Sequence, residues 1–224
     1  DPMLLGREAA YLGVLADDLC RLGASEPYRM FTSRSEWRLL LREDNADLRL
    51  TELGRAVGLV DDERWRRFTS RREAIARGMH VLQSHEARPQ DAVDAHLLAL
   101  GEAALRQPTT LADLLQRPAL ELLPLLQAAG HTVPLSEDEA EQLTVQCRYS
   151  GYLHRQQREV ERILEAASIA VPEGFDYAVP GLRTELVEKL SVRAPATLGE
   201  AARIEGMTPA AINLLAARIH RVGA

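Results

Sequence analysis

Apolar side chains recur along the chain every three or four residues, which is the spacing of one face of an α-helix. The most regular run begins at Ser136, which has the spacing of a capping box with Glu139, and Pro172 ends it. One stripe along this run consists of Val145, Tyr149, Tyr152, Gln156, Val160, Ile163 and Ala167. The pattern predicts a long amphipathic helix over residues 136–170 that packs in a bundle of helices.

Weaker helical patterns occupy most of the remaining chain. One helix is predicted over 7–22, and another runs from Asp61, where adjacent acids suit a helix N-terminus, to about residue 86. Prolines divide the next region, so its helices are predicted to be short; they are Pro89, Pro108, Pro118, Pro124 and Pro134. No segment alternates convincingly with the period of a β-strand. The chain is therefore predicted to be all-α.

The C-terminal part is predicted to form a small helical subdomain. Residues 171–182 are rich in proline and glycine, which is typical of a linker. Three short helices are predicted beyond it, over 183–192, 197–205 and 208–221. Gly206 is predicted to form the turn between the last two of them. The resulting division is an arginine-rich segment over 1–50, a helical domain over 51–180 and the subdomain over 181–224.

Residues 26–50, EPYRMFTSRSEWRLLLREDNADLRL, place arginines among aromatic rings in a chain of net charge −6. A capping box from Ser33 to Glu36 predicts a helix that brings Arg34, Arg38 and Arg42 into one row. Guanidinium groups bind phosphate, and flat rings stack on unpaired RNA bases, so the segment is a candidate RNA contact. The alternative is that nearby acids neutralise the same arginines in structural ion pairs; these acids are Glu36, Glu43, Asp44 and Asp47.

Motifs for catalysis or cofactor binding were not found in the sequence. It contains no glycine-rich nucleotide loop, and His80, His85 and His96 lack metal-ligand spacing. The two cysteines, Cys20 and Cys147, lie far apart without a CxxC motif, as in proteins of a reducing cytoplasm. No apolar run approaches the roughly 18 residues that cross a bilayer. We therefore expect a cytoplasmic protein without a membrane partner and assign no catalytic, cofactor-binding or metal-binding residue to this chain.

The last two predicted helices allow two interpretations. A helix, a glycine turn and a helix are the order of a DNA-binding helix-turn-helix. A helix that reads the major groove needs polar or basic residues in its first turns, whereas this one begins PAAINLLAA. A buried helix, or one that lends an apolar face to a protein partner, is the favoured interpretation.

Four stretches together resemble the C-terminal part of the flavin-dependent tRNA-modifying proteins called MnmG, or glucose-inhibited division protein A (GidA). They follow the order of that family from about Leu4 onward, and residues 70–135 between them match poorly. The stretches are YLGVLADDL, EPYRMFTSRSEWRLLLREDNADLRLTELGRAVGLVDDERW, CRYSGYLHRQQ and TLGEAARIEGMTPAAINLL. Trp37 stands where the family usually has tyrosine, and Ser150 where it usually has an acid.

The resemblance implies a function for a longer parent protein. With the GTPase MnmE, such a protein installs a carboxymethylaminomethyl or aminomethyl group at carbon 5 of the wobble uridine of certain tRNAs. It uses FAD, NADH and methylene-tetrahydrofolate, and the resemblance implies a homodimer within a heterotetramer. The flavin site and the catalytic cysteines belong to an N-terminal FAD domain. The unusual start Asp1-Pro2-Met3 leads us to expect that this chain is a piece without that domain.

By the same resemblance, this region recognises partners and does not catalyse. Arg29, Arg34, Arg38 and Arg42 are the candidates for tRNA contact. The candidates for docking the GTPase are Gly199, Arg203, Ile204, Gly206, Ile212, Leu215 and Ile219. Part of the arginine-rich segment is alternatively expected to pack on the absent FAD domain. A second alternative is a purely protein-docking module that makes no tRNA contact.

Overall fold

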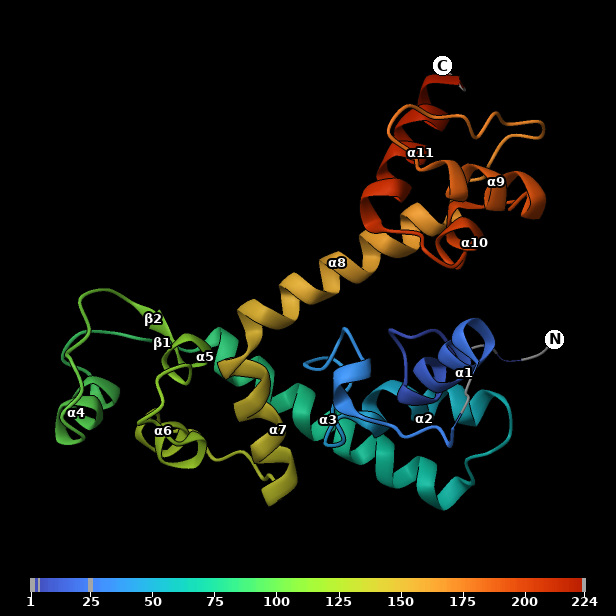
Figure 1. Ribbon diagram of the computed structural model, residues 1–224. Helices are drawn as coiled ribbons and strands as arrows, with labels where there is room; N and C mark the ends of the chain where they lie inside the picture. The colour runs from blue at the N-terminus through green and yellow to red at the C-terminus, as the bar shows by residue number, and fades with distance from the viewer. Residues whose placement is uncertain (1–2, 4, 24–25, 223–224) are drawn as a thin grey trace. The chain divides into compact units, whose positions relative to one another are not determined.

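The computed structural model describes residues 3, 5–23 and 26–222 of the chain (Figure 1). It confirms the prediction of an all-α protein. In the described residues, the only strands are β1 (Glu86–Ala87) and β2 (Thr109–Thr110), a two-residue antiparallel pair. The chain forms two compact units: residues 1–37 with 155–224 make the first, and residues 38–154 make the second. The predicted division at residues 50 and 180 stays a prediction.

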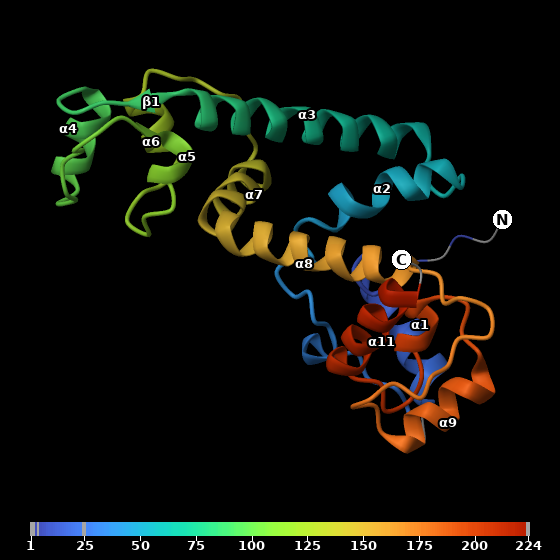
Figure 2. The same cartoon turned by 90° about the horizontal axis from the view of Figure 1, so that it is seen from above.

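The second unit is organised along one long helix, α3 (Asp62–Ser84), which begins and ends close to the predicted bounds. Asp61 caps it, because its carboxylate accepts a hydrogen bond from the backbone N–H of Arg64 at 2.8 Å. Figure 2 shows α2 (Ala46–Ala56) along one half of α3. Short helices gather at the other end: α4 (Ala92–Ala99), α5 (Leu111–Leu114) and α6 (Leu122–Ala128).

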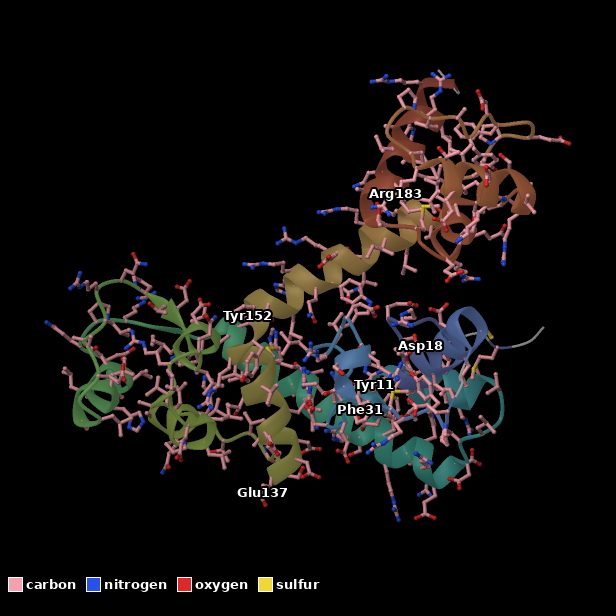
Figure 3. The ribbon with its side chains drawn as sticks, in the orientation of Figure 1. Tyr11, Asp18, Phe31, Glu137, Tyr152 and Arg183 are labelled. Carbon is pink, nitrogen blue, oxygen red and sulfur yellow. The ribbon has the colours of Figure 1, made fainter. Side chains whose placement is uncertain are left out.

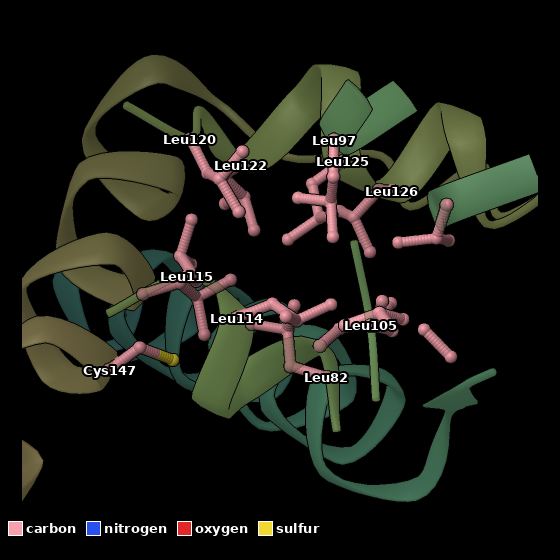
Figure 4. Close-up of a cluster of buried hydrophobic side chains, with 14 of the residues drawn as sticks. Leu82, Leu97, Leu105, Leu114, Leu115, Leu120, Leu122, Leu125, Leu126 and Cys147 are labelled. Carbon is pink, nitrogen blue, oxygen red and sulfur yellow. The ribbon is translucent and has the colours of Figure 1, made fainter. Parts of the chain in front are cut away.

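Leucines from these short helices and from α7 (Glu137–Arg148) fill the core of the second unit (Figure 4). The fully buried members are Leu82, Leu97, Leu111, Leu114, Leu115, Leu120, Leu125, Leu126 and Leu143. Each leucine removed from water stabilises the fold by about 1.5–3 kcal/mol. The proline-divided region thus folds as a set of one- and two-turn helices around a shared apolar centre.

The first unit contains α1 (Tyr11–Leu22), the single 3₁₀ turn η1 (Thr32–Arg34) and the C-terminal helices. The latter are α9 (Thr184–Arg193), α10 (Leu198–Ala202) and α11 (Pro209–Val222), which confirm the three short helices predicted there. They surround the C-terminal half of α8 (Ser150–Ser168) in Figure 1. Their core combines Leu190, Leu198, Ala201, Ile204, Leu215 and Ile219.

Residues 171–182, which were predicted to be a linker, pack against the C-terminal helices. Tyr177 and Val179 are buried in the core of the C-terminal helices. The backbone N–H of Val171 donates to the carbonyl of Ala196 at 2.9 Å, and Leu198 donates to Ile169 at 2.9 Å. Proline and glycine form turns within a packed segment here, so their abundance alone does not distinguish a linker from a packed segment.

The predicted helix over 136–170 is two helices, because the backbone leaves helical geometry at Tyr149 between α7 and α8. The capping box from Ser136 to Glu139 is present at its start. Along α8 this apolar stripe is only partly buried. Val160 is buried, whereas Tyr152 is 60% exposed and Ile163 is 50% exposed.

The helix predicted from Ser33 does not form. Residues 35–45 contain no helix, so Arg34, Arg38 and Arg42 do not stand in a helical row. The capping box fails because the Glu36 carboxylate accepts hydrogen bonds from Arg7, while the Ser35 hydroxyl accepts the N–H of Trp37 at 3.2 Å. The helix of α1 also begins later than predicted, at Tyr11 in place of residue 7.

Candidate nucleic-acid interface and docking surface

A buried carboxylate organises the arginine-rich segment of the first unit. Asp18 on α1 accepts hydrogen bonds from Arg7 Nη1 and from the Tyr28 hydroxyl, both at 2.6 Å, and Arg34 Nη1 lies 3.5 Å away. Burial by itself raises the pKa of the Asp18 carboxyl, but the hydrogen bonds from Tyr28 and Arg7 outweigh it and hold the pKa below its usual range. We did not identify this centre from the sequence.

Arg7 connects α1 to the segment around η1. Its guanidinium donates to Asp17 at 3.1 Å, to Glu36 at 2.9 Å and to the backbone carbonyl of Arg34 at 3.0 Å. Burial opposes the charge on Arg7, but the carboxylates of Glu36 and Asp18 raise its pKa further above the usual range. Arg7 is therefore a permanent cation that cross-links two segments far apart in the sequence.

The two predicted RNA-contact arginines of the first unit have different environments. Arg34 lies over the ring of Tyr28, with its Cζ 4.5 Å from the centroid, and its Nε donates to the carbonyl of Arg29 at 3.0 Å. Arg29 lies over the ring of Phe31 at 5.0 Å, and both side chains are exposed. Figure 3 labels Phe31 and Asp18 in this part of the chain.

The other two predicted RNA-contact arginines belong to the second unit. Arg42 forms an ion pair with Asp44 at 2.9 Å and donates to the carbonyl of Leu39 at 2.7 Å. Arg38 is exposed and forms no ion pair with any residue that the structure describes. The four arginines therefore form no single row, and the predicted structural pairing by nearby acids holds for Arg42.

The residues predicted to dock a GTPase lie mainly inside the C-terminal helices. Ile204, Leu215 and Ile219 are buried in the core, and Ile212 is partly buried. A Cβ at Gly199 would lie 2.8 Å from Ala167 Cβ, so this glycine allows α10 to approach α8 closely. Gly206 adopts φ +88° in the turn before α11, a conformation that favours glycine. Of this set, Arg203 presents an exposed charged side chain.

The outward face of α11 carries the accessible side chains of the terminal hairpin. Asn213, Leu214, Ala217 and Arg218 are exposed, whereas Leu215 is buried. Thr208 caps the helix, because its hydroxyl accepts the N–H of Ala211 at 3.2 Å. The apolar sequence of this helix therefore mainly reflects burial of its inner face, and its exposed face carries both apolar and polar side chains.

A groove of about 620 Å³ lies within the first unit, and it had no signal in our sequence analysis. Ala16 and Cys20 of α1 line it together with Ile163 and Leu164 of α8, and Arg203 stands at its edge. The Cys20 side chain is exposed. The groove combines apolar walls with charged margins, which is typical of surfaces that contact another protein segment.

The remaining titratable groups show no assembled metal centre in the described part of the chain. No group of three or more His, Cys, Asp or Glu residues there could hold a metal ion. His85 Nδ1 and His131 Nε2 lie 2.9 Å apart, and burial raises the pKa of the Cys147 thiol to about 11. No described helix combines the length and apolar character that crossing a membrane requires.

Comparisons with known proteins place this architecture in a family. Family models of the "tRNA modifying enzyme MnmG/GidA C-terminal helical domain" and "C-terminal helical bundle" match residues 62–157 and 159–223. The crystal form II structure of Aquifex aeolicus GidA shares 33% identity at a TM-score of 0.71, over 98% of this chain and 34% of that one. The crystal form I structure shares 33% sequence identity at a TM-score of 0.69, over 97% of this chain and 33% of that one.

Each Aquifex aeolicus GidA chain is therefore about three times as long as the part that this chain matches. Both family models describe C-terminal helical regions, and together they extend over most of the described chain. The chain belongs to the MnmG/GidA family of tRNA-modifying enzymes, as a part of its C-terminal helical region.

Proposed function

We propose that this chain is the recognition part of a tRNA wobble-uridine-modifying flavoenzyme, and that it contacts tRNA and docks an MnmE-type GTPase. The family match carries the proposal, because both family models describe tRNA-modifying enzymes. The site geometry supports recognition, because the arginine side chains of Arg29 and Arg38 are exposed. Chemistry then belongs to the parent protein, with FAD, NADH and methylene-tetrahydrofolate as its cofactors and co-substrates.

The tRNA contact is proposed at exposed guanidinium groups that are not neutralised locally. Arg29 and Arg38 form no ion pair with a described residue, whereas Arg42 is held by Asp44 and Arg34 by Asp18. Cations already paired with carboxylates gain less from a phosphate, because the existing pair must first be broken. Arg29 and Arg38 are therefore the contact arginines, and Arg34 and Arg42 position their segments.

Binding to an unmodified tRNA transcript at several salt concentrations tests this contact. We expect the double variant Arg29→Ala, Arg38→Ala to bind more weakly and to lower the slope of log affinity against log salt by about 1 to 2. The matched control is Arg67→Ala, Arg77→Ala, which removes two exposed arginines paired with Glu63 and Glu73 on α3. Equal losses in the two double variants would contradict a specific contact.

The GTPase dock is proposed on the exterior of the C-terminal helices. Arg203 and the exposed face of α11 supply accessible side chains, while Ile204, Leu215 and Ile219 hold the helices together from within. The mixed face of Leu214 and Arg218 fits a protein surface better than a nucleic acid groove.

Capture of the GTPase by the full chain tests this dock. Leu214→Asp combined with Arg218→Glu is expected to reduce capture at least tenfold while circular dichroism stays unchanged, since both side chains are exposed. Val192→Asp is the control, because Val192 is 86% exposed on α9. If capture survives the double change on α11, the dock lies elsewhere.

The groove of the first unit supports a further part of the proposal, namely packing against an FAD domain of the parent. Apolar walls at Ile163 and Leu164 are left uncovered, and two thirds of the related GidA chain lie outside the matched part. We place the parent in the cytoplasm, as a homodimer within a heterotetramer with the GTPase.

A purely protein-docking module is the second candidate function. It is favoured by the internal engagement of Arg34 and Arg42 and by the uncovered apolar groove. GTPase capture without any tRNA binding would establish it.

A further inference from the structure

The loop over residues 28–31 exposes an aromatic ring beside a guanidinium group. Phe31 is 46% exposed and the adjoining Met30 is 41% exposed. The Arg29 guanidinium carbon lies 5.0 Å from the centroid of the Phe31 ring, which is within the range of a cation–π contact. One loop tip therefore presents a flat apolar face and a positive charge together.

The base of this loop is fixed on both sides of the tip. Tyr28 donates its hydroxyl hydrogen to Asp18 at 2.6 Å. Arg34 stacks on the Tyr28 ring at 4.5 Å and donates to the Arg29 carbonyl at 3.0 Å. On the other side of the tip, the backbone N–H of Arg34 donates to the Phe31 carbonyl at 3.0 Å. Because the Arg29 and Phe31 carbonyls are both held in this way, little ordering remains to be done when a ligand binds.

The charge around the tip favours a polyanion over a protein surface. Residues 26–34 contain two arginines and one acid, Glu26. The carboxylate of Asp18 is occupied by Tyr28 and Arg7. Arg29 thus stays available to a phosphate, and an exposed ring in contact with a guanidinium group is the pairing on which unpaired bases stack.

We propose that Phe31 and Arg29 form a stacking platform for an unpaired base of tRNA, with Arg34 as the residue that positions the platform. This inference rests on the proposed tRNA contact and adds to it the ligand class, an unstacked base with its adjoining phosphate. The Phe31 ring would contact the face of a base directly, which the arginines alone do not do. Double-stranded RNA keeps its bases stacked on one another, so only an unpaired base can stack on the ring.

Equilibrium binding of the full chain to an unmodified tRNA transcript tests the platform, with a fully paired RNA duplex as the comparison ligand. Phe31→Ala is expected to weaken tRNA binding about 5- to 150-fold with an unchanged salt slope, and Phe31→Trp is expected to retain it. Arg29→Ala is expected to weaken binding and to lower the salt slope by about 1. Leu53→Ala, at another exposed apolar residue, is the control and should bind as the unaltered chain does.

The outcomes separate this inference from the proposed function. Absence of tRNA binding by the unaltered chain overturns both. Binding that is insensitive to Phe31→Ala, or equal losses on tRNA and duplex, overturns the platform and leaves the tRNA contact standing. Since Phe31 is exposed, the variant is expected to fold; circular dichroism checks this, and Phe31→Leu replaces it if the alanine variant unfolds.

Discussion

At the scale of single residues, Asp18 connects several parts of the arginine-rich segment. It joins α1 to Arg7 on one side and to Tyr28 and Arg34 on the other. Hydrogen bonds to a charged group stabilise a fold by about 1.5–3 kcal/mol, which exceeds the value of an exposed ion pair. The conformation of the proposed stacking loop therefore depends on one ionised carboxylate at its base.

Replacement of this carboxylate should change how stability depends on pH. The folded-state pKa of Asp18 is lowered, so its contribution is fully present above the unfolded pKa of about 3.9 and is lost as pH falls through the folded value. Asp18→Asn is expected to cost about 1.5–3 kcal/mol at neutral pH and to flatten the loss of stability as the pH falls below about 4. Thermal unfolding across pH measures both effects.

The control for this pH effect is Glu173→Gln, at an exposed acid in the first unit. It should leave stability within about 0.5 kcal/mol of the original at every pH. Identical pH profiles for Asp18→Asn and the unaltered chain would show that the partners of Asp18 do not lower the pKa of its carboxyl.

At the scale of elements, local signals predicted most helices and failed where distant residues intervened. The capping box at Ser136 forms without a competing partner for Glu139 among the described residues, and the Glu139 carboxylate accepts the Ser136 N–H at 2.7 Å. The same spacing at Ser33 fails because Glu36 is bound by Arg7, 29 residues earlier. A capping motif is thus a sufficient sequence signal only when no partner from another element binds its carboxylate.

The candidate site was predictable in composition but not in geometry. The sequence located arginines beside rings, and Arg29 with Phe31 and Arg34 with Tyr28 do lie in contact. The contribution of Asp18 depended on Arg7 and Tyr28 reaching it across loops, which residue spacing does not encode. The docking set followed from the family resemblance, and its apolar members Ile204, Leu215 and Ile219 are buried in the core of the C-terminal helices.

At the scale of the whole molecule, the described residues contain two separate hydrophobic cores. One is formed by the leucines of the second unit, and the other by α9, α10 and α11 with residues 169–182. Each core has its own fully buried leucines, such as Leu114 and Leu190. Proteins with separate cores often unfold in more than one step, because each core can lose its packing while the other persists.

Calorimetry of the full chain should therefore show that core substitutions act on different transitions. Leu190→Ala is expected to cost about 2–5 kcal/mol and to lower one melting temperature by roughly 10 °C or more, while the other transition stays in place. Leu114→Ala should lower the melting temperature of the other transition and leave the first in place. Val192→Ala, at an exposed position on the same helix as Leu190, should shift neither transition. If Leu190→Ala and Leu114→Ala instead shift one common transition, the two cores unfold as a single cooperative unit. A ligand that binds only the folded C-terminal helices would then stabilise the second unit as well.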